Sequence, residues 1–353
     1  MRPTMAPGPQ ALPGRPARAH LRPMIPSQPL PDAAPANWVD RHAPAAWRPW
    51  LKLGRFDRPT GIWLLMLPGW QGIALYSAEQ GAWPPLRLLA LFALGAALMR
   101  AAGCAFNDIV DRDFDARVAR TADRPVASGR IGVRAAWAFV IACSLGGLAI
   151  LLTLNLMSLF LGVCSLTLVA AYPFMKRITW WPQAWLGLTF NWGVLLGYAA
   201  AQTGPAGINI LALAIHAWSD GVNLALYTPP LPASAWLLYA SLVLWTLGYD
   251  TIYAVQDLED DALVGVKSSA RRLGDRAPRA VLLFYLASVA AAVAAWREAG
   301  LTWGFLPLAA LYAGQLVWQA LKLKVDDPAG ALRLFKSNTL AGVMLFTAIV
   351  AGR

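Results

Sequence analysis

Acidic residues are concentrated in two short segments of this chain. Only 19 Asp and Glu residues occur among 353 positions, yet the segment 107–115 reads NDIVDRDFD and the segment 257–261 reads DLEDD. In a helix, residues three, four or seven positions apart share a face. The spacing therefore predicts one stripe of carboxylates in each segment, made by Asp108, Asp111 and Asp115 in the first and by Asp257 and Asp261 in the second.

Each stripe needs a positive partner, because neighbouring carboxylates on one helix face repel each other. Oxygen donors with no His or Cys nearby favour a hard cation such as Mg²⁺, which keeps positions for water and phosphate oxygens. Arg binds phosphate through paired hydrogen bonds and Lys as a point charge. Basic residues of both kinds follow the two segments: Arg117, Arg120, Arg124, Lys267 and Arg271. Together the segments predict a metal-bridged diphosphate site; the alternative for each is a solvated acidic loop.

The composition predicts that membrane helices position these residues. Only 14% of the residues are charged and 58% are hydrophobic, against about 25% and 45–50% in ordinary globular proteins. Apolar runs of about 18 or more residues are typical of membrane spans. We expect an all-α fold, a polytopic bundle of nine spans at 59–78, 86–106, 135–154, 157–174, 182–200, 233–255, 279–296, 301–321 and 334–351.

The distribution of basic residues predicts how this bundle is oriented. Lys and Arg are enriched in cytoplasmic loops, and with nine spans the basic loops after spans two, four, six and eight share the side of the N-terminus. Four crossings separate the acidic segments, so both are expected in one chamber on the cytoplasmic side. The segment 202–232 contains an apolar run too short to cross the membrane, so it is predicted to be a loop or interfacial element.

Other features exclude several function classes. The net charge of +11 is explained by the basic loops, and no basic stripe interleaved with aromatic residues indicates a nucleic-acid partner. Three Cys and three His residues are too scattered for a disulfide framework or a zinc site.

The N-terminal region is predicted to be a disordered Pro/Arg-rich tail over residues 1–46, followed by a membrane domain over residues 47–353. Residues 1–31 contain four Arg, no acidic residue and frequent Pro, a composition that cannot bury enough apolar surface to fold. An organelle transit peptide is the alternative. We expect a bacterial plasma membrane, with the mitochondrial inner membrane as the alternative.

The residues around the acidic segments resemble the two signatures of the UbiA superfamily of intramembrane prenyltransferases. The first reads NDxxDxxxD from Asn107, followed by RTxxRP from Arg120; the second reads YDTxYAxxDxxDD from Tyr249, followed by GxKS from Gly265. Two further segments, YPFMKRxTxxPQxxLG from Tyr172 and RxDRPxG from Arg55, resemble the 4-hydroxybenzoate polyprenyltransferase branch of ubiquinone synthesis. The resemblance runs from about residue 47 to the end of the chain.

The resemblance implies a Mg²⁺-dependent reaction. It transfers an all-trans polyprenyl chain from its diphosphate to the ring carbon ortho to the hydroxyl of 4-hydroxybenzoate. It also implies that two Mg²⁺ ions on the donor diphosphate are held by Asn107, Asp108, Asp111, Asp115, Asp257 and Asp261. The helical chamber would open toward the cytoplasm and, between helices, toward lipid. Only the segment 202–232 departs from this pattern, because it is longer than expected.

Several side chains near the signatures are candidates for roles in binding and catalysis. An intramembrane charge such as Arg100 suggests function; it binds the acceptor carboxylate, the diphosphate or an acidic residue, or else extends to the interface. Lys176 lies four positions after Tyr172. It binds the diphosphate, or it is simply one of the basic residues that mark the cytoplasmic loops. Asp250 with Tyr253 polarises the acceptor phenol or forms a buried structural pair. Arg58 binds the benzoate carboxylate, whereas Arg48, Lys52 and Arg55 are expected to anchor the first span to anionic lipid.

Two alternative functions stay open at this level. A transporter of a divalent cation or an anionic metabolite also contains intramembrane acids and bases, although its acids usually lie near the bilayer midplane. Within the superfamily, the acceptor is 4-hydroxybenzoate or another compound such as a naphthoate, homogentisate or haem.

Overall fold

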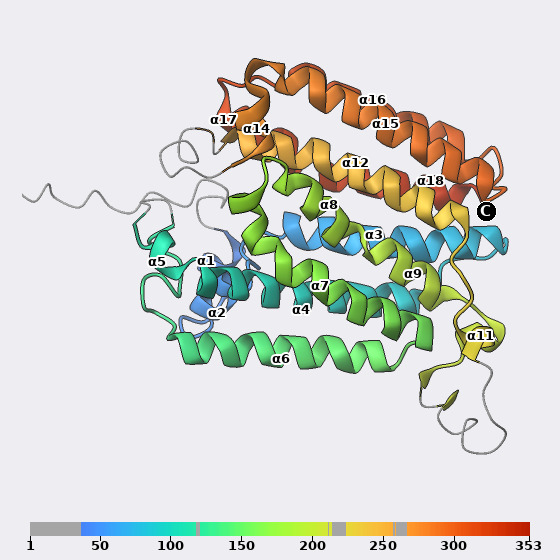
Figure 1. The fold of residues 1–353 in the computed structure, drawn as a ribbon, viewed down its shortest axis with the longest axis horizontal. Helices are drawn as coiled ribbons and strands as arrows, with labels where there is room; N and C mark the ends of the chain where they lie inside the picture. Colours follow the sequence, from blue (N-terminus) through green and yellow to red (C-terminus); the bar gives the residue numbers. More distant parts are fainter. Residues whose placement is uncertain (1–36, 118–120, 211, 214–223, 257, 259–266) are drawn as a thin grey trace, which may run out of the picture.

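The computed structural model describes residues 37–117, 121–210, 212–213, 224–256, 258 and 267–353. In this part the chain is helical, with one isolated β-bridge between Asn155 and Asn209, which confirms the all-α prediction. Figure 1 shows the long helices lying side by side along one direction. The elements are α1 Trp38–His42, α2 Arg48–Leu53, α3 Thr60–Glu79, α4 Leu86–Val110, α5 Arg112–Asp115, α6 Val133–Leu152, α7 Leu156–Ile178, α8 Pro182–Asn191, α9 Gly193–Ala201, η1 Gly204–Gly207, α11 Leu224–Tyr227, α12 Ala233–Gln256, α14 Ser269–Leu273, η2 Gly274–Arg276, α15 Ala277–Glu298, α16 Phe305–Lys322, α17 Pro328–Lys336 and α18 Asn338–Ala351.

Each of the nine predicted spans coincides with a long helix or a pair of consecutive helices. The fifth predicted span is divided between α8 and α9, and the ninth begins in α17 and continues in α18. Five helical segments among the described residues are long and apolar enough to cross a membrane, namely Leu86–Val110, Val133–Leu152, Leu156–Met175, Ser269–Glu298 and Pro328–Ala351. The protein is therefore an integral membrane protein, while the count of nine crossings remains a prediction.

The main hydrophobic core lies between α3, α9, α12, α15, α16 and α18. Small residues allow the first two of these helices to approach closely. A Cβ atom on Gly72 would clash with the carbonyl oxygen of Val194, and one on Gly197 would clash with the carbonyl oxygen of Gly69. A smaller core joins α2, α4 and α6 through residues such as Leu53 and Ala105.

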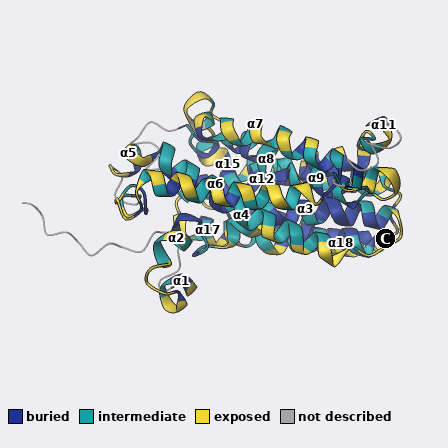
Figure 2. Cartoon of the chain, turned by 90° about the horizontal axis from the view of Figure 1, so that it is seen from below, coloured by how far each residue is buried: buried dark blue, intermediate teal, exposed yellow. Residues whose placement is uncertain are grey.

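The outer helices expose apolar side chains. In Figure 2, exposed residues mark α6 and α7, whereas buried residues concentrate around α3 and α9. On α6 the exposed side chains include Ile141, Leu145 and Leu148. Such a surface is suited to lipid rather than water, because soluble proteins rarely expose large contiguous apolar patches.

The ordered chain begins before the boundary predicted at residue 46. Helix α1 packs Val39 out of solvent, and Lys52 of α2 forms an ion pair with Asp40 at 2.7 Å. The indole nitrogen of Trp38 donates to the carbonyl oxygen of Phe56 at 2.7 Å. Residues 37–46 therefore belong to the folded part, and the rest of the predicted tail lies outside the described residues.

The described parts of 202–232 contain the 3₁₀ turn η1 and the one-turn helix α11. Most of the apolar run at 208–217 lies outside the described residues, so the predicted role of this segment stays open. Figure 1 shows α4 and α12, the helices that precede the two acidic segments, ending at the same end of the bundle as α5, α14 and α17.

Candidate active site

The first acidic segment spans a turn between two helices. Helix α4 ends at Val110, Asp111 is the residue between the helices, and α5 ends at Asp115. Asp108 and Asp115 both approach Arg124, whose Nη1 lies 3.5 Å from Asp108 Oδ1 and 2.7 Å from Asp115 Oδ2. The predicted single stripe is therefore divided, because Asp111 has a different partner.

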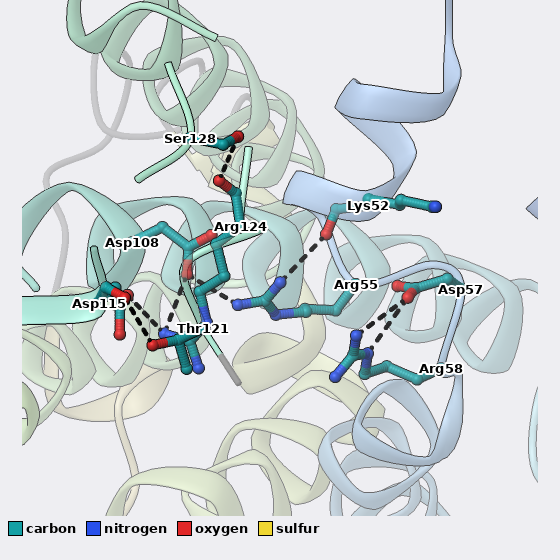
Figure 3. Close-up of polar contacts among 9 residues, drawn as sticks. All are labelled: Lys52, Arg55, Asp57, Arg58, Asp108, Asp115, Thr121, Arg124 and Ser128. Atoms are coloured by element: carbon teal, nitrogen blue, oxygen red, sulfur yellow. Dashed lines mark hydrogen bonds and ion pairs between the residues drawn. The ribbon is translucent and has the colours of Figure 1, made fainter. Parts of the chain in front are cut away.

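Asp108 is enclosed by arginine side chains. Its side chain is 1% exposed, and Arg55 Nη2 donates to its Oδ1 at 2.8 Å. Figure 3 shows Arg55 and Arg124 both reaching this carboxylate, with Asp115 beyond Arg124. The prediction that Arg55 anchors the chain to lipid is wrong, because its side chain is buried against Asp108.

Asp111 lines a cavity together with Asn107. Tyr172 and Pro173 of α7 and Pro182 of α8 form the rest of its wall. The cavity has an empty volume of about 320 Å³, including the space that is open to solvent. The site thus brings the first signature together with the motif that begins at Tyr172, two segments that the sequence separates by about sixty residues.

The cavity wall fits an oxygen-coordinated cation. Asn107 and Asp111 provide amide and carboxylate oxygens, the donors that Mg²⁺ prefers. Arg177 Nη2 lies 3.4 Å from Asp111 Oδ1, and its side chain is 58% exposed, so this ion pair is weak and readily exchanged. Within the described ranges no three His, Cys, Asp or Glu side chains are grouped as a complete metal site; the predicted ligands Asp257 and Asp261 lie outside those ranges.

The residues that flank the second acidic segment reach the end of α7. Lys267 Nζ donates to the carbonyl oxygen of Ile178 at 3.1 Å, one residue beyond the Arg177 that contacts Asp111. The guanidinium of Arg271 lies over the ring of Trp180, 5.7 Å from its centroid. These contacts bring the chain that follows the second signature beside the first signature.

Arg100 lies in α4 and packs between helices. Its guanidinium is 5.4 Å from the centroid of the Phe190 ring, and its Nε is buried without a hydrogen-bond partner. A Cβ atom on Gly61 of α3 would lie 2.8 Å from Arg100 Nε and Nη2. Glycine at position 61 therefore makes the space in which this guanidinium lies.

Tyr172 of α7 lies within electrostatic range of charged residues on α4 and α12. Its hydroxyl lies within electrostatic range of Asp250, Arg100 and Asp111. On the same helix as Asp250, Tyr253 packs on Phe335 of α17, with 4.7 Å between the ring centroids. The predicted catalytic residues Arg100, Tyr172 and Asp250 are thus near one another.

Other predicted substrate-binding residues differ in their surroundings. Arg58 pairs with its neighbour Asp57, with Nη2 3.1 Å from Oδ2. Arg117 is exposed. Arg120 and the side chain of Lys176 lie outside the described part of the chain.

Two residues of the site were missed from sequence. From sequence, Arg55 is expected, with Arg48 and Lys52, to anchor the first span to anionic lipid, and Arg177 is given no role in the site. The signal for Arg55 was its position as the first residue of the motif RxDRPxG, which carries the resemblance to the 4-hydroxybenzoate branch.

The UbiA prenyltransferase family matches residues 65–347 of the chain. The protein belongs to the UbiA family. It is therefore a prenyltransferase. The mitochondrial 4-hydroxybenzoate polyprenyltransferase of Arabidopsis thaliana is 42% identical over 318 residues, which make up 90% of this chain and 72% of that protein. The relative of the same name from Caenorhabditis elegans is 38% identical over 92% of this chain and 84% of its own.

Solved structures of UbiA homologues have the same fold. The apo structure of a homologue from Aeropyrum pernix K1 has a TM-score of 0.62 at 27% identity and covers 82% of this chain and 96% of its own. A homologue from Archaeoglobus fulgidus bound to GPP and Mg²⁺ has a TM-score of 0.57 at 17% identity and covers 86% of this chain and 99% of its own. At 17% identity the likeness of this UbiA family member extends to the fold alone.

Proposed function

We propose that this prenyltransferase transfers an all-trans polyprenyl chain from its diphosphate to the ring carbon ortho to the hydroxyl of 4-hydroxybenzoate, with Mg²⁺, in ubiquinone biosynthesis. The observation that carries the proposal is the cavity lined by Asn107, Asp111 and Tyr172, where the first signature meets the motif of the 4-hydroxybenzoate branch. The names of the relatives from Arabidopsis thaliana and Caenorhabditis elegans support this acceptor.

The donor diphosphate is proposed to bind at the end of α4. Asn107 and Asp111 of the cavity wall, with Asp257 and Asp261, would hold two Mg²⁺ ions there, whereas Asp115 is buried and paired with Arg124. When bound, Mg²⁺ supplies charge stabilisation for the departing diphosphate. Basic residues of the signatures and of the motif at Tyr172 would add to this stabilisation, because the diphosphate gains negative charge as the allylic carbon–oxygen bond breaks: Arg117, Arg120, Lys176, Arg177 and Lys267.

The aromatic acceptor is proposed to bind deeper in the bundle. Arg100 lies two turns before Asn107 on α4, and its buried guanidinium has an unpaired Nε. We assign it to the carboxylate of the acceptor, since guanidinium and carboxylate match as planar, charge-assisted partners. Tyr172 and Asp250, within electrostatic range of each other, would orient the phenol, and Tyr253 would limit the space beside it.

The reaction needs a site without water. The allylic C–O bond breaks with its electron pair leaving on the diphosphate, a carbon–carbon bond forms to the ring, and the ring carbon then loses its proton. Water would compete for the allylic carbon, so walls of apolar helices give exclusion as well as positioning. Placement in the membrane also suits a donor whose chain is itself a lipid.

The membrane is proposed to be the mitochondrial inner membrane, because the relatives named above are called mitochondrial; this inference replaces the bacterial plasma membrane as the preferred location. An acceptor other than 4-hydroxybenzoate remains the alternative within the family. Transport is no longer an alternative of equal standing, since the chain belongs to a family of prenyltransferases.

Purified membranes test the proposal. Wild type should join radiolabelled 4-hydroxybenzoate to a polyprenyl diphosphate with added Mg²⁺, lose this activity with a chelator, and regain it when Mg²⁺ is restored. Asp111→Asn should lower the rate at least about a hundredfold, since it removes a carboxylate that would bind the metal. Product formation that survives both chelation and this substitution contradicts the proposal.

A further inference from the structure

Arg55 occupies a backbone conformation that usually belongs to glycine. Its φ of 59° makes it the one non-glycine residue with positive φ in the described part of the chain. The amide of Arg55 donates to Lys52 O at 3.1 Å, and that of Phe56 donates to Leu51 O at 2.9 Å. This is the Schellman pattern that ends helices, with arginine at the position where glycine is normally found. Because this conformation costs free energy in a residue other than glycine, we expect the Arg55 side chain to have a structural or functional role.

The side chain of Arg55 is used inside the protein. Its Nη2 donates to Asp108 Oδ1 at 2.8 Å, and its Nη1 donates to Lys52 O at 3.4 Å. Asp108 is also close to Arg124, which binds Asp115. Two guanidinium groups and two carboxylates thus form a chain without net charge. The charge of Asp108 is compensated in this chain through Oδ1, whereas its Oδ2 is buried, away from solvent and without a hydrogen-bond partner among the described residues.

Asp108 and its neighbours in the signature have different surroundings. Asn107 and Asp111 line the cavity, and Asp108 is absent from its lining. Asp111 contacts the exposed side chain of Arg177, whereas the Oδ1 atom of Asp108 is held by Arg55 and Arg124. In the sequence motif these carboxylates look equivalent, but in the folded protein their contacts differ.

We propose that Arg55 and Asp108 are a positioning pair, and that Asp108 is not a metal ligand. The pair fixes the orientation of the end of α4. Asn107, which precedes Asp108, and Asp111, one helical turn after it, then face the cavity. The inference rests on the proposed function of that cavity as the metal and diphosphate site. Residues that orient metal ligands without touching the metal typically change metal affinity about 10- to 100-fold when they are replaced.

The test is metal binding rather than turnover. Purified protein in lipid nanodiscs is titrated with Mn²⁺ at a saturating concentration of farnesyl S-thiolodiphosphate, an unreactive donor analogue. Bound Mn²⁺ is followed by electron paramagnetic resonance, which gives the number of ions per chain and the half-saturating concentration. Asp108→Asn should keep the number of ions found for wild type and raise the half-saturating concentration about 10- to 100-fold. Asp111→Asn should lower the number of ions.

Arg55 provides a second route to the same answer. Arg55→Gly removes the guanidinium and suits the positive φ, so it should fold even if Asp108→Asn does not, and it should weaken Mn²⁺ binding to a similar extent. Arg55→Lys should recover part of the lost Mn²⁺ affinity. The double variant Arg55→Gly/Asp108→Asn should bind Mn²⁺ no more weakly than the single variant with the lower affinity, because both substitutions remove the same interaction. Asp113→Asn is the matched control. Asp113 lies in the same segment, exposed and paired with Arg112 at 2.9 Å, a hydrogen bond that lowers its pKa.

Each contrary result has one meaning. A lower number of Mn²⁺ ions in Asp108→Asn would make Asp108 a ligand and overturn the inference. An unchanged half-saturating concentration in both Asp108→Asn and Arg55→Gly, with a lower melting temperature, would make the pair merely structural and overturn it as well. If wild type shows no analogue-dependent Mn²⁺ binding, the proposed function fails first.

Discussion

Individual charged residues in this protein are defined by what surrounds them. Arg100, Arg55 and Arg124 are all arginines near one acidic segment, yet the first packs on an aromatic ring and the others pair with buried carboxylates. Pairing neutralises Arg55 and Arg124. The buried Nε of Arg100 has no partner, so this side chain keeps capacity for an anionic substrate group.

Arg100→Lys should lower kcat/KM for 4-hydroxybenzoate about 10- to 150-fold, because lysine keeps the charge but lacks the planar fork, and a hydrogen bond to a charged group is worth about 1.5–3 kcal/mol. The KM for the polyprenyl diphosphate should change little. Initial rates in membranes, with each substrate varied in turn, measure both constants.

Arg87→Lys is the control, since Arg87 is an exposed residue near the start of the same helix. A variant Arg100→Lys with the kinetic constants of wild type would show that Arg100 does not hold the acceptor. A selective rise in the KM of the diphosphate would assign Arg100 to the donor instead.

At the scale of elements, the site depends on where helices end and how closely they pack. The turn at Asp111 separates α4 from α5 and lets Asp115 return to Arg124. Glycine at position 61 allows the guanidinium of Arg100 to lie against α3. The end of α7 at Ile178 accepts a hydrogen bond from Lys267, two residues before α14 begins. The site is therefore assembled from helix ends and connections rather than from one helix face.

Gly61→Ala should lower activity at least about tenfold, because the new methyl group would lie 2.8 Å from Arg100 Nε and Nη2 and must displace the guanidinium or strain the core. The rate with 4-hydroxybenzoate and the melting temperature are measured together. Activity should fall even below the temperature at which unfolding begins.

Gly95→Ala is a suitable comparison for this substitution. Gly95 lies on α4, and an added Cβ atom meets only Ile150 Cδ1, at 3.9 Å, which is ordinary contact. If Gly61→Ala and Gly95→Ala have equal activity, the position of Arg100 does not depend on the close contact with α3.

The molecule as a whole separates a polar end from an apolar outer surface. The first acidic segment, the end of α12 and the helices α5, α14 and α17 gather at one end of the bundle (Figure 1). Only 11% of the apolar window of α6 is buried inside the protein, so the rest of that helix depends on lipid. This arrangement suits an enzyme whose donor has a charged head and a lipid chain.

Leu145→Lys should reduce membrane insertion and stability, since Leu145 is 59% exposed near the middle of α6 and a lysine at the centre of a span costs about 2.5–3.5 kcal/mol. The measurements are the fraction of protein recovered in membranes and its melting temperature in nanodiscs. Leu145→Met should behave as wild type. Equal recovery of the lysine and methionine variants would mean that α6 does not face lipid.

The helices and the family of this protein could be predicted from sequence, because apolar runs and motif spacing are local properties. The predicted range 86–106 became α4 Leu86–Val110, and the range 135–154 became α6 Val133–Leu152. The prediction of Asn107, Asp111 and Tyr172 as site residues also rested on motifs that occupy short stretches of the chain, and these three residues line one cavity.

The division of labour within the first signature was decided by contacts between distant segments. Helical periodicity places Asp108 and Asp111 on one stripe, but it contains no information about a guanidinium arriving from position 55 or a loop that returns at position 124. Which carboxylate is enclosed and which lines the cavity depends on these partners. Burial and ion pairing are properties of the packed chain, so no spacing rule along the sequence can supply them.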